Sequence, residues 1–445
     1  MNNTAPTTIP TGQEHARVDG RLKVTGRAQY AAEIPLPGLV HAALVQSTIP
    51  AGRLVALDTA AAERAPGVVG ILSARNMPRL ALPPDDLLGK GRPGEPYVPL
   101  QDDRIQWAGQ HLALVVAETS EQARYAAELV RARYEEDPSP ALRLEDALGD
   151  ATEPELWGGR EKLQVRRGDA PTALVKAETV VRPTYGTPVV NHNPIELVST
   201  TAHWEAPDRL VVHDTTRGIQ QLQRVLASAF SLAVEDVRVL APFVGGAFGS
   251  KGFQWQHPMM VAAAARMVSR PVRLEFTRME MFTTAGRRAR TVQNLALGAT
   301  HQGFLNAVTH ETLTTSSPVI EYTEPAGNLS RNLYTVPNVA VSHRLATIHE
   351  PSPCPMRAPG EAPGSFALEC AMDELAYALG LDPLELRLRN HADEDAYERK
   401  PYSSKHLKEC YAQGADAFGW ARRNPEPRSM GSDDGRLLVG WGMST

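Results

Sequence analysis

Short apolar runs and helical spacings alternate along the first third of the chain. The runs Val40–Val45, Val68–Leu72 and Leu112–Ala117 predict strands. Directly after the third run, Thr119 and Gln122 have the spacing of a capping box, which predicts the start of a helix. The apolar face of that helix recurs at Ala123, Ala126, Ala127 and Val130. Strands interspersed with helices in this way indicate a mixed α+β or α/β architecture.

The middle of the chain repeats the same alternation. Strands are predicted at Leu210–His213, Val237–Leu240 and Val272–Phe276. Helices are predicted after Gly218 and across Pro258–Met267, where the Ala- and Met-rich composition is typical of a buried helix. We therefore expect several strands joined through helices, which again favours a mixed fold.

Two further helices are predicted nearer the C-terminal end from their capping residues. Ser365 is placed to cap a helix that ends at Gly380. Asp382, Pro383 and Glu385 fit the N-cap, N1 and N3 positions of the next helix. The first of these helices would carry Phe366, Cys370, Leu375 and Leu379.

Length and local composition divide the chain into unequal parts. At about 150 residues per domain, 445 residues correspond to roughly three domains. An acidic stretch with several Pro and Gly residues is typical of a linker, although a long surface loop within one domain is the alternative. We expect a disordered tail at 1–16, a domain at 17–137, a linker at 138–162, a domain at 163–423 and the start of a third at 424–445.

The last of these segments is expected to be incomplete. Leu437, Leu438 and Val439 predict the beginning of a strand, and the sequence has no further element after it. A single apolar strand cannot bury its side chains alone. The pattern therefore predicts that only the beginning of the third domain is present.

Composition and charge exclude several classes of protein. The chain has 46 Lys and Arg against 51 Asp and Glu, a net charge of -5, so no basic field indicates nucleic acid as a partner. No run approaches the roughly 18 apolar residues of a membrane span. Cys354, Cys370 and Cys410 are odd in number and form no C-x-x-C pair, which argues against a disulfide framework, a zinc site or an iron–sulfur site on this chain.

The densest chemical signal is the loop Gly245–Gly252, between a predicted strand and a predicted helix. Glycines allow backbone N–H groups to approach a ligand closely. Ser250 stands where a Walker A loop needs Gly before its Lys, and Ala247 stands where a dinucleotide fingerprint needs a Gly. A ligand-binding loop of another kind and a simple tight turn both remain open.

Two polar clusters accompany this loop. Cys354–Glu361 is rich in Pro and Ala around Arg357, which predicts a stiff loop that presents one permanent cation. Such an Arg suits an anionic ligand group or a developing oxyanion, and a structural ion pair is the alternative. Asn191–Glu196 is a polar run between apolar segments, in which His192 alone would be a structural histidine.

Taken together and in this order, these segments resemble the large subunit of the molybdenum hydroxylases, the xanthine dehydrogenase and aldehyde oxidase family. Val18–Tyr30 is similar to the family's opening motif, and Gly109–Glu135 to the end of its α/β hammerhead domain. Val244–Lys251 resembles its Gly-Gly-x-Phe-Gly-x-Lys loop, and Met356–Leu375 its Arg-containing loop and following helix. The likeness covers nearly the whole chain and is greatest to the bacterial three-subunit aldehyde oxidoreductases.

The resemblance implies an α+β fold with an α/β hammerhead domain at 17–137, the first molybdopterin-binding domain at 163–423 and the start of the second at 424–445. It implies a molybdenum cofactor, expected in a dinucleotide form, whose metal is held by a pterin dithiolene and not by protein side chains. The implied reaction is hydroxylation of an aldehyde or related carbon with oxygen from water.

The resemblance also implies which residues form the site. Arg357 would be catalytic and would stabilise negative charge on the substrate oxygen in the transition state. No protein ligand to the metal is expected. The cofactor-binding residues would be Gly245, Gly246, Ala247, Phe248, Gly249, Arg217, Ala358 and Gly360.

Three departures from the family pattern bear on function. Arg217 stands where the family commonly has a Gln that donates to the apical oxygen of molybdenum. Gly252 stands where the purine-oxidising branch has a Glu, which favours an aldehyde over xanthine. The family's general base is a Glu in the second cofactor-binding domain, so we expect this chain to be incomplete and inactive alone.

The implied partners are an iron–sulfur subunit and an FAD subunit, because this chain has neither centre. A separate chain could supply the missing C-terminal domain. The alternative is a non-catalytic remnant or assembly module that docks to such subunits without binding the cofactor. The absence of a signal peptide predicts a cytoplasmic location, and export through the signal of a partner is the alternative.

Overall fold

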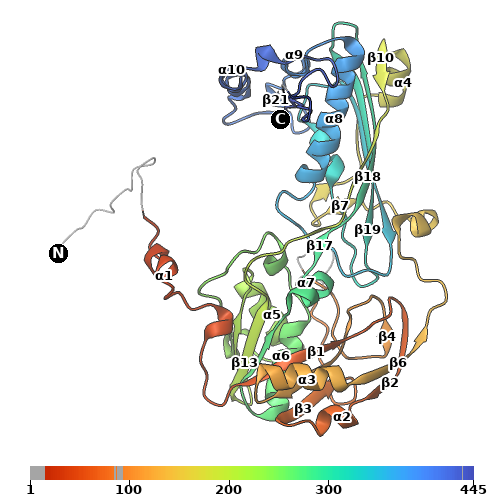
Figure 1. The fold of residues 1–445 in the computed structure, drawn as a ribbon. Coiled ribbons are helices and arrows are strands. Elements are labelled where there is room, and N and C mark those ends of the chain that lie inside the picture. Colours follow the sequence, from red (N-terminus) through yellow and green to blue (C-terminus); the bar gives the residue numbers. More distant parts are fainter. Residues whose placement is uncertain (1–15, 85–86, 88–93, 433) are drawn as a thin grey trace.

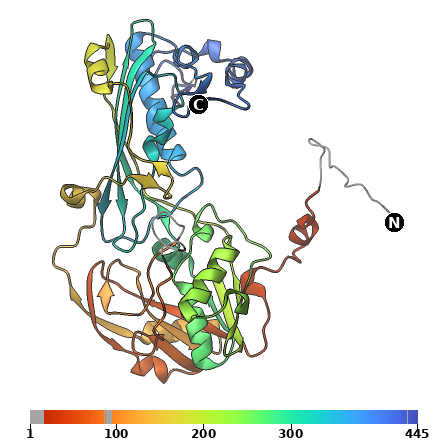
Figure 2. The same ribbon diagram turned by 180° about the vertical axis from the view of Figure 1, so that it is seen from behind.

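The computed structural model describes residues 16–84, 87, 94–432 and 434–445. Two lobes lie one above the other, and the chain passes between them several times (Figure 1). The tail predicted at 1–16 lies outside the described residues except for Ala16. Helix α1 (Gly20–Val24) has no buried residue and lies on an arm apart from both lobes in both views (Figures 1 and 2).

A mixed seven-stranded sheet forms the centre of the lower lobe. Its strand order is β15-β14-β13-β16-β1-β5-β3, with β1 parallel to β16 and antiparallel to β5. The strands are β1 (Val40–Gln46), β3 (Val68–Ser73), β5 (His111–Ala117), β13 (Ser199–Ala206), β14 (Arg209–Asp214), β15 (Val237–Leu240) and β16 (Val272–Glu275). Strands from both sides of the predicted linker 138–162 therefore share one sheet.

Strand β5 is buried over its whole length because both of its faces are covered. Leu114 and Val116 belong to the core that contains helix α6 (His257–Val268). Ala113 and Val115 face the opposite cluster, which contains helix α3 (Ser120–Leu129). This double burial explains the continuous apolar run in the sequence, since a one-sided strand would alternate apolar and polar residues.

The remaining elements of the lower lobe are short. A three-stranded sheet has the order β4-β2-β6 and lies beside the main sheet. Helix α5 packs against β15, and α7 lies near the junction with the upper lobe (Figure 1). Their bounds are β2 (Gly52–Asp58), β4 (Arg104–Ile105), β6 (Arg131–Glu136), α2 (Ala60–Glu63), α5 (Ile219–Phe230) and α7 (Arg278–Thr284).

A six-stranded sheet with the order β10-β18-β19-β20-β9, and with β11 paired to β18, forms the upper lobe. Helix α8 (Glu361–Leu379) packs on one face and α4 (Ala170–Lys176) on the other. The strands are β9 (Val165–Arg167), β10 (Thr179–Val181), β11 (Thr184–Thr187), β18 (Thr291–Ala299), β19 (Leu305–Ser316) and β20 (Asn338–Thr347).

Short pairs complete the structure. The pair β12–β17 lies between the lobes, where β17 leads directly into the upper sheet (Figure 1). The other elements are β7 (Leu156–Trp157), β8 (Glu161–Lys162), β12 (Val190–Asn191), β17 (Arg287–Arg288), β21 (Glu394–Asp395), β22 (Lys400–Pro401), α9 (Pro383–Arg389) and α10 (Leu407–Phe418). In the part of the chain that the structure describes, no helix is long and apolar enough to cross a membrane.

Most local predictions are confirmed. The capping box of Thr119 and Gln122 starts α3, and Gly380 ends α8 in the left-handed conformation. Asp382 caps α9 by accepting the N–H of Leu384. The start predicted at Ser365 is wrong, because α8 begins at Glu361 and tolerates Pro363 within its first turn, where no intrahelical donor is required.

The strand predicted at Leu437–Val439 is also wrong. Leu438 forms only an isolated bridge with Gly431, and no sheet continues from it. The side chains of Leu437 and Leu438 are 64% and 72% exposed. Without a neighbouring sheet to pack against, the apolar run adopts no regular strand.

A buried ion pair joins α8 to α9 and generates a test of the fold. The Arg387 side chain is fully buried, and its guanidinium lies 2.8 Å from both Glu369 and Asp373. We expect Arg387→Met to lower the free energy of unfolding by about 3–5 kcal/mol, because it leaves Glu369 buried without a counter-charge. Urea unfolding measures this change.

The matched control is Arg389→Met on the same helix. The Arg389 side chain pairs with Glu385 while 30% exposed, and exposed pairs contribute less than about 1 kcal/mol. Equal losses in the two variants would contradict a structural role for the buried pair.

Candidate functional site

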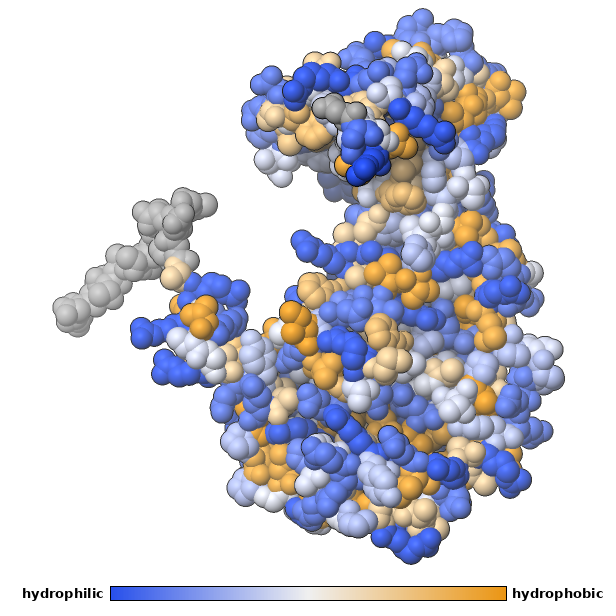
Figure 3. All heavy atoms as spheres, viewed as in Figure 1, coloured by the Kyte–Doolittle hydropathy of each residue, from blue (hydrophilic) through white to orange (hydrophobic). Residues whose placement is uncertain are grey.

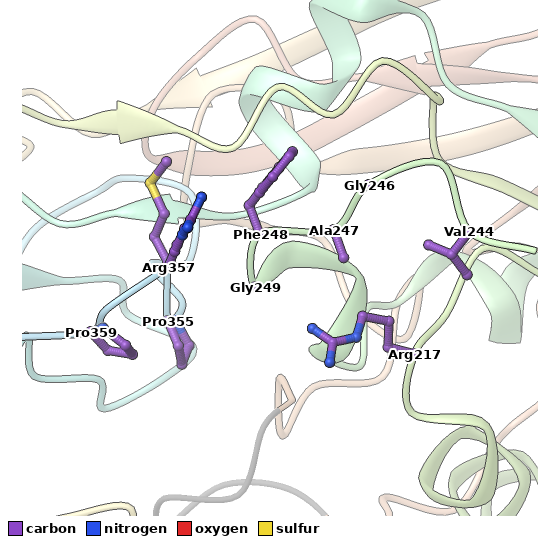
Figure 4. A pocket seen from close by; sticks show the side chains of 10 residues that line it. Arg217, Val244, Gly246, Ala247, Phe248, Gly249, Pro355, Arg357 and Pro359 are labelled. Atoms are coloured by element: carbon purple, nitrogen blue, oxygen red, sulfur yellow. The ribbon is translucent and has the colours of Figure 1, made fainter. Parts of the chain in front are cut away.

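Three segments that are distant in the sequence meet at one pocket of about 630 Å³ between the lobes (Figure 4). One is the turn between β14 and α5, the second is the Gly-rich loop after β15, and the third is the loop before α8, here called the Arg357 loop. The lining residues are Arg217, Val244, Gly246, Ala247, Phe248, Gly249, Pro355, Met356, Arg357 and Pro359. The surface is hollowed between the lobes on the face shown in Figure 3.

The Gly-rich loop presents unpaired backbone donors. Its residues Gly246, Phe248 and Gly249 have positive φ values of 96°, 52° and 125°. The four N–H groups from Gly246 to Gly249 donate to no acceptor in the part of the chain that the structure describes. Successive amides in such a turn form a concavity that binds anions.

The Gly-rich loop and the Arg357 loop contact each other through their backbones. A Cβ atom on Gly249 would lie 1.7 Å from the carbonyl oxygen of Pro355, so only glycine permits this approach. The N–H of Arg357 donates to the carbonyl of Phe248 at 2.9 Å. His192 lies behind the contact, with Nε2 3.1 Å from the same Pro355 oxygen. The polar run around His192 therefore supports the two loops.

Lys251 holds the Gly-rich loop from behind and does not face the pocket. Its buried ammonium lies 2.6 Å from Oε2 of Glu196, and burial lowers the pKa of Lys251. The same carboxylate accepts the N–H of Gly245 at 2.6 Å. The carbonyl of Lys251 accepts the N–H of Arg217 at 2.7 Å, which fixes the first segment to the second.

Arg217 and Arg357 are exposed cations at the pocket. Among the described residues, neither guanidinium has a carboxylate partner or a hydrogen bond, and no acidic residue lines the pocket. Figure 4 shows Arg217 reaching beneath the Gly-rich loop from one side, while Arg357 lies beside Phe248 on the other. Two free positive charges next to free amides favour an anionic ligand.

The other predicted residues differ in their surroundings. Gly245, Ala358 and Gly360 do not line the pocket. The N–H of Gly360 donates to Oε1 of Glu324 at 2.7 Å, as that of Gly245 does to Glu196, so both amides are already used within the protein. Ala358 has φ +57°, and its N–H has no acceptor among the described residues.

Two charged residues that support the site, Arg288 and Glu324, carry no local sequence signal. They lie on β17 and in the segment after β19, and each contacts the backbone of the Arg357 loop. Only the folded arrangement brings them together.

A second polar cluster is buried at the end of β14, where Asp214, Lys251 and His257 line a small cavity. Asp214 ends β14, accepts the hydroxyl of Thr200 and lies 3.9 Å from Nε2 of His257. Burial raises the pKa of Asp214 to about 7 and lowers that of His257 to about 3. Both groups are therefore neutral at mildly acidic pH, which suits an interior with few counter-charges.

The close approach of the two loops can be tested at Gly249. We expect Gly249→Ala to lower the free energy of unfolding by about 2 kcal/mol or more, because the new Cβ atom meets the Pro355 carbonyl and alanine disfavours the observed φ. Gly252→Ala is the matched control, since a Cβ atom there has nothing within 4 Å. Denaturant unfolding compares them, and a tolerated Gly249→Ala would contradict the backbone contact.

Asp214 generates a pH prediction. Its folded pKa of about 7 exceeds its ordinary 3.8, so its contribution to stability is full below the unfolded pKa and is lost as the pH rises through the folded pKa. The free energy of unfolding of Asp214→Asn minus that of the unmodified chain should therefore be larger at about pH 8 than at about pH 5. We expect this difference to grow by about 1–3 kcal/mol between the two pH values.

Unfolding curves at both pH values measure this difference. Asp208→Asn, at an exposed position between β13 and β14, serves as the control and should leave the pH dependence unchanged. The same pH dependence in Asp214→Asn and in the unmodified chain would contradict the assignment.

Comparisons with known proteins agree with this geometry. Residues 156–391, more than half of the chain, match the model of the molybdopterin cofactor-binding domain. Residues 25–138 match the a/b hammerhead domain of aldehyde oxidase and xanthine dehydrogenase. These matches confirm the predicted α+β fold class and the resemblance to the molybdenum hydroxylases.

Relatives and solved structures extend the comparison. The chain is 37% identical over 436 residues to the aldehyde oxidoreductase molybdenum-binding subunit PaoC of Escherichia coli K12, covering 97% of this chain and 57% of the relative. It is 29% identical to the putative xanthine dehydrogenase molybdenum-binding subunit XdhA of the same organism, covering 96% of this chain and 58% of that one. The chain thus spans a little over half the length of these relatives.

The fold resembles the aldehyde oxidoreductase of Desulfovibrio gigas with a TM-score of 0.78 at 24% identity, over 91% of this chain and 46% of that one. Quinoline 2-oxidoreductase of Pseudomonas putida 86 has the same TM-score at 22% identity, over 92% of this chain and 54% of that one. Together with the match over residues 156–391, these findings show that the chain belongs to the aldehyde oxidase and xanthine dehydrogenase family of molybdopterin-binding proteins.

Proposed function

We propose that this chain forms the first part of the molybdopterin-binding catalytic subunit of a molybdenum hydroxylase that oxidises aldehydes with oxygen from water. The observation that carries the proposal is the pocket between the lobes, where four backbone amides and two guanidinium groups that have no partner within the described ranges converge. A site of this kind matches the anionic character of a pterin phosphate cofactor.

The residues present fit that group in size and chemistry. A volume of about 630 Å³ lies in the range of small-molecule and cofactor sites. Val244, Pro355 and Pro359 supply apolar surface, and the charged side chains among the lining residues are those of Arg217 and Arg357. Within the described ranges, no group of three or more His, Cys, Asp and Glu could hold a metal, so the pocket offers donors to an anion and no ligand set to a metal.

Each group has a role that follows from its position. When bound, the cofactor supplies the two-electron oxidation of the substrate carbon. The amides of Gly246 to Gly249 would donate to its oxygen atoms, and Arg217 would place a further cation beneath the loop. Arg357 would stabilise negative charge that develops on the substrate oxygen, since it is permanently charged and its guanidinium has no partner among the described residues.

An aldehyde substrate is favoured over a purine. Gly252 has no side chain at the position where the purine-oxidising branch has a Glu, and the relative PaoC is named an aldehyde oxidoreductase. The proposed electron acceptors are iron–sulfur and FAD subunits, because the relatives are named molybdenum-binding subunits. A dinucleotide form of the cofactor belongs to the same proposal.

The catalytic role of Arg357 is tested in the assembled holoenzyme. We expect Arg357→Met to lower kcat for an aromatic aldehyde by about 10²–10³-fold, because one preorganised charge at the developing oxyanion is lost. Its molybdenum content per chain should stay unchanged. Arg124→Met, at an exposed position on α3, is the matched control and should retain full activity.

Two results would overturn the proposal. Absence of molybdenum from the purified assembly would remove the cofactor assignment, and unchanged kcat in Arg357→Met would remove the catalytic one. Elemental analysis and steady-state kinetics with a dye acceptor measure the two separately.

A further inference from the structure

The Arg357 loop has an unusual pattern of backbone hydrogen bonds. One nitrogen of Arg288, Nη2, lies 3.1, 2.6 and 3.2 Å from the carbonyl oxygens of Met356, Arg357 and Ala358. Three successive carbonyls therefore converge on a single cation. Since C=O and the following N–H point in opposite directions across a trans peptide, the amides of Arg357 and Ala358 point away from Arg288.

The amides of Arg357 and Ala358 differ in their hydrogen bonding. The N–H of Arg357 donates to Phe248 of the Gly-rich loop, whereas that of Ala358 has no acceptor among the described residues. The next residue, Pro359, has no N–H to donate. The loop thus offers one free backbone donor, from Ala358, next to the free side chain of Arg357.

Glu324 completes the arrangement from the other side. It is fully buried, its Oε1 lies 3.4 Å from Nε of Arg288, and the same oxygen accepts the N–H of Gly360 at 2.7 Å. The hydroxyl of Tyr322 donates to its second oxygen at 3.1 Å. The carboxylate therefore neutralises Arg288 and fixes the far end of the loop.

The backbone at Ala358 needs such support. Its φ of +57° is unfavourable for alanine, and a residue in this conformation persists only when its surroundings hold it. Arg288 donates to the carbonyl of Arg357, which precedes Ala358, and to the carbonyl of Ala358 itself. These two hydrogen bonds hold the backbone of Ala358 in this conformation.

We propose that Arg288 and Glu324 are a buried positioning pair that turns the carbonyls of residues 356–358 inward, holds the Arg357 loop against the Gly-rich loop and thereby presents the Arg357 side chain at the pocket to an oxyanionic ligand. Neither residue lines the pocket, so both act through the loop. The inference rests on the proposed function, in which the pocket binds an anionic cofactor.

The neighbouring residue provides a matched comparison. Arg287 is also on β17 and also pairs with a largely buried glutamate, Glu350, but its side chain makes no hydrogen bond to the backbone of residues 356–360 among the described residues. The two pairs thus share strand, charge and burial, and they differ in their contact with the loop. Arg287→Met/Glu350→Gln is therefore the control for Arg288→Met/Glu324→Gln.

Double variants are used because removal of Arg288 alone would leave Glu324 buried without a counter-charge and could prevent folding. Gln at position 324 keeps an acceptor for the Gly360 N–H. Amide hydrogen exchange on the full 445-residue chain, resolved at Arg357, then reports whether the loop still holds its contact with Phe248.

We expect Arg288→Met/Glu324→Gln to exchange the Arg357 amide about tenfold faster, while the control pair leaves it unchanged. Inorganic phosphate, titrated by calorimetry, should bind the test variant about 10–100-fold more weakly than the unmodified chain. Arg288→Lys should recover part of this affinity, because its ammonium can still donate to the carbonyls.

The outcomes separate the two proposals. Equal exchange in the test and control variants overturns the positioning pair, as does faster exchange with undiminished phosphate binding. If the unmodified chain binds no phosphate, the anion site of the proposed function fails, and the exchange comparison alone then decides whether Arg288 holds the loop.

Discussion

The contact between the backbones of Gly249 and Pro355 is the constraint on which the site depends. The Gly-rich loop belongs to the lower lobe and the Arg357 loop leads into a helix of the upper lobe, so this contact joins the two lobes at the pocket. A side chain at Gly249 would separate the loops, because its Cβ atom would occupy the position of a carbonyl oxygen. The hydrogen bond from Arg357 to Phe248 exists only while the loops are this close.

Buried ion pairs determine which charges remain available at the surface of the pocket. Lys251 is neutralised by Glu196 behind the Gly-rich loop, and Arg288 by Glu324 behind the Arg357 loop. Buried pairs of this kind add little net stability, because desolvation offsets their attraction, but each one fixes a loop by its additional hydrogen bonds. Arg217 and Arg357 have no such partners among the described residues, and they are therefore the cations left to meet a ligand.

Local signals in the sequence predicted the local structure well. The capping box at Thr119 and the N-cap at Asp382 depend on residues within one turn, and both form as predicted. The start of α8 was missed because the loop before it ends at Gly360, whose φ of +78° cannot be read from its neighbours. The pocket segments were found by motif, whereas Arg288 and Glu324 contact the loop through side chains that come from β17 and from the segment after β19, both distant from the loop in the sequence. No local pattern records such contacts.

The division of the site between the lobes has a consequence for its chemistry. Most of its donors are backbone amides, whose directions are set by φ and ψ and not by side-chain identity. Substitutions that keep the backbone can therefore leave binding intact, while any change that shifts one lobe against the other alters both loops together. The sheet of the lower lobe includes strands from both sides of the 138–162 segment, so the hammerhead part of the chain also contributes to holding the Gly-rich loop in place. The geometry of the pocket is thus a property of the whole chain, although its lining residues come from three short segments.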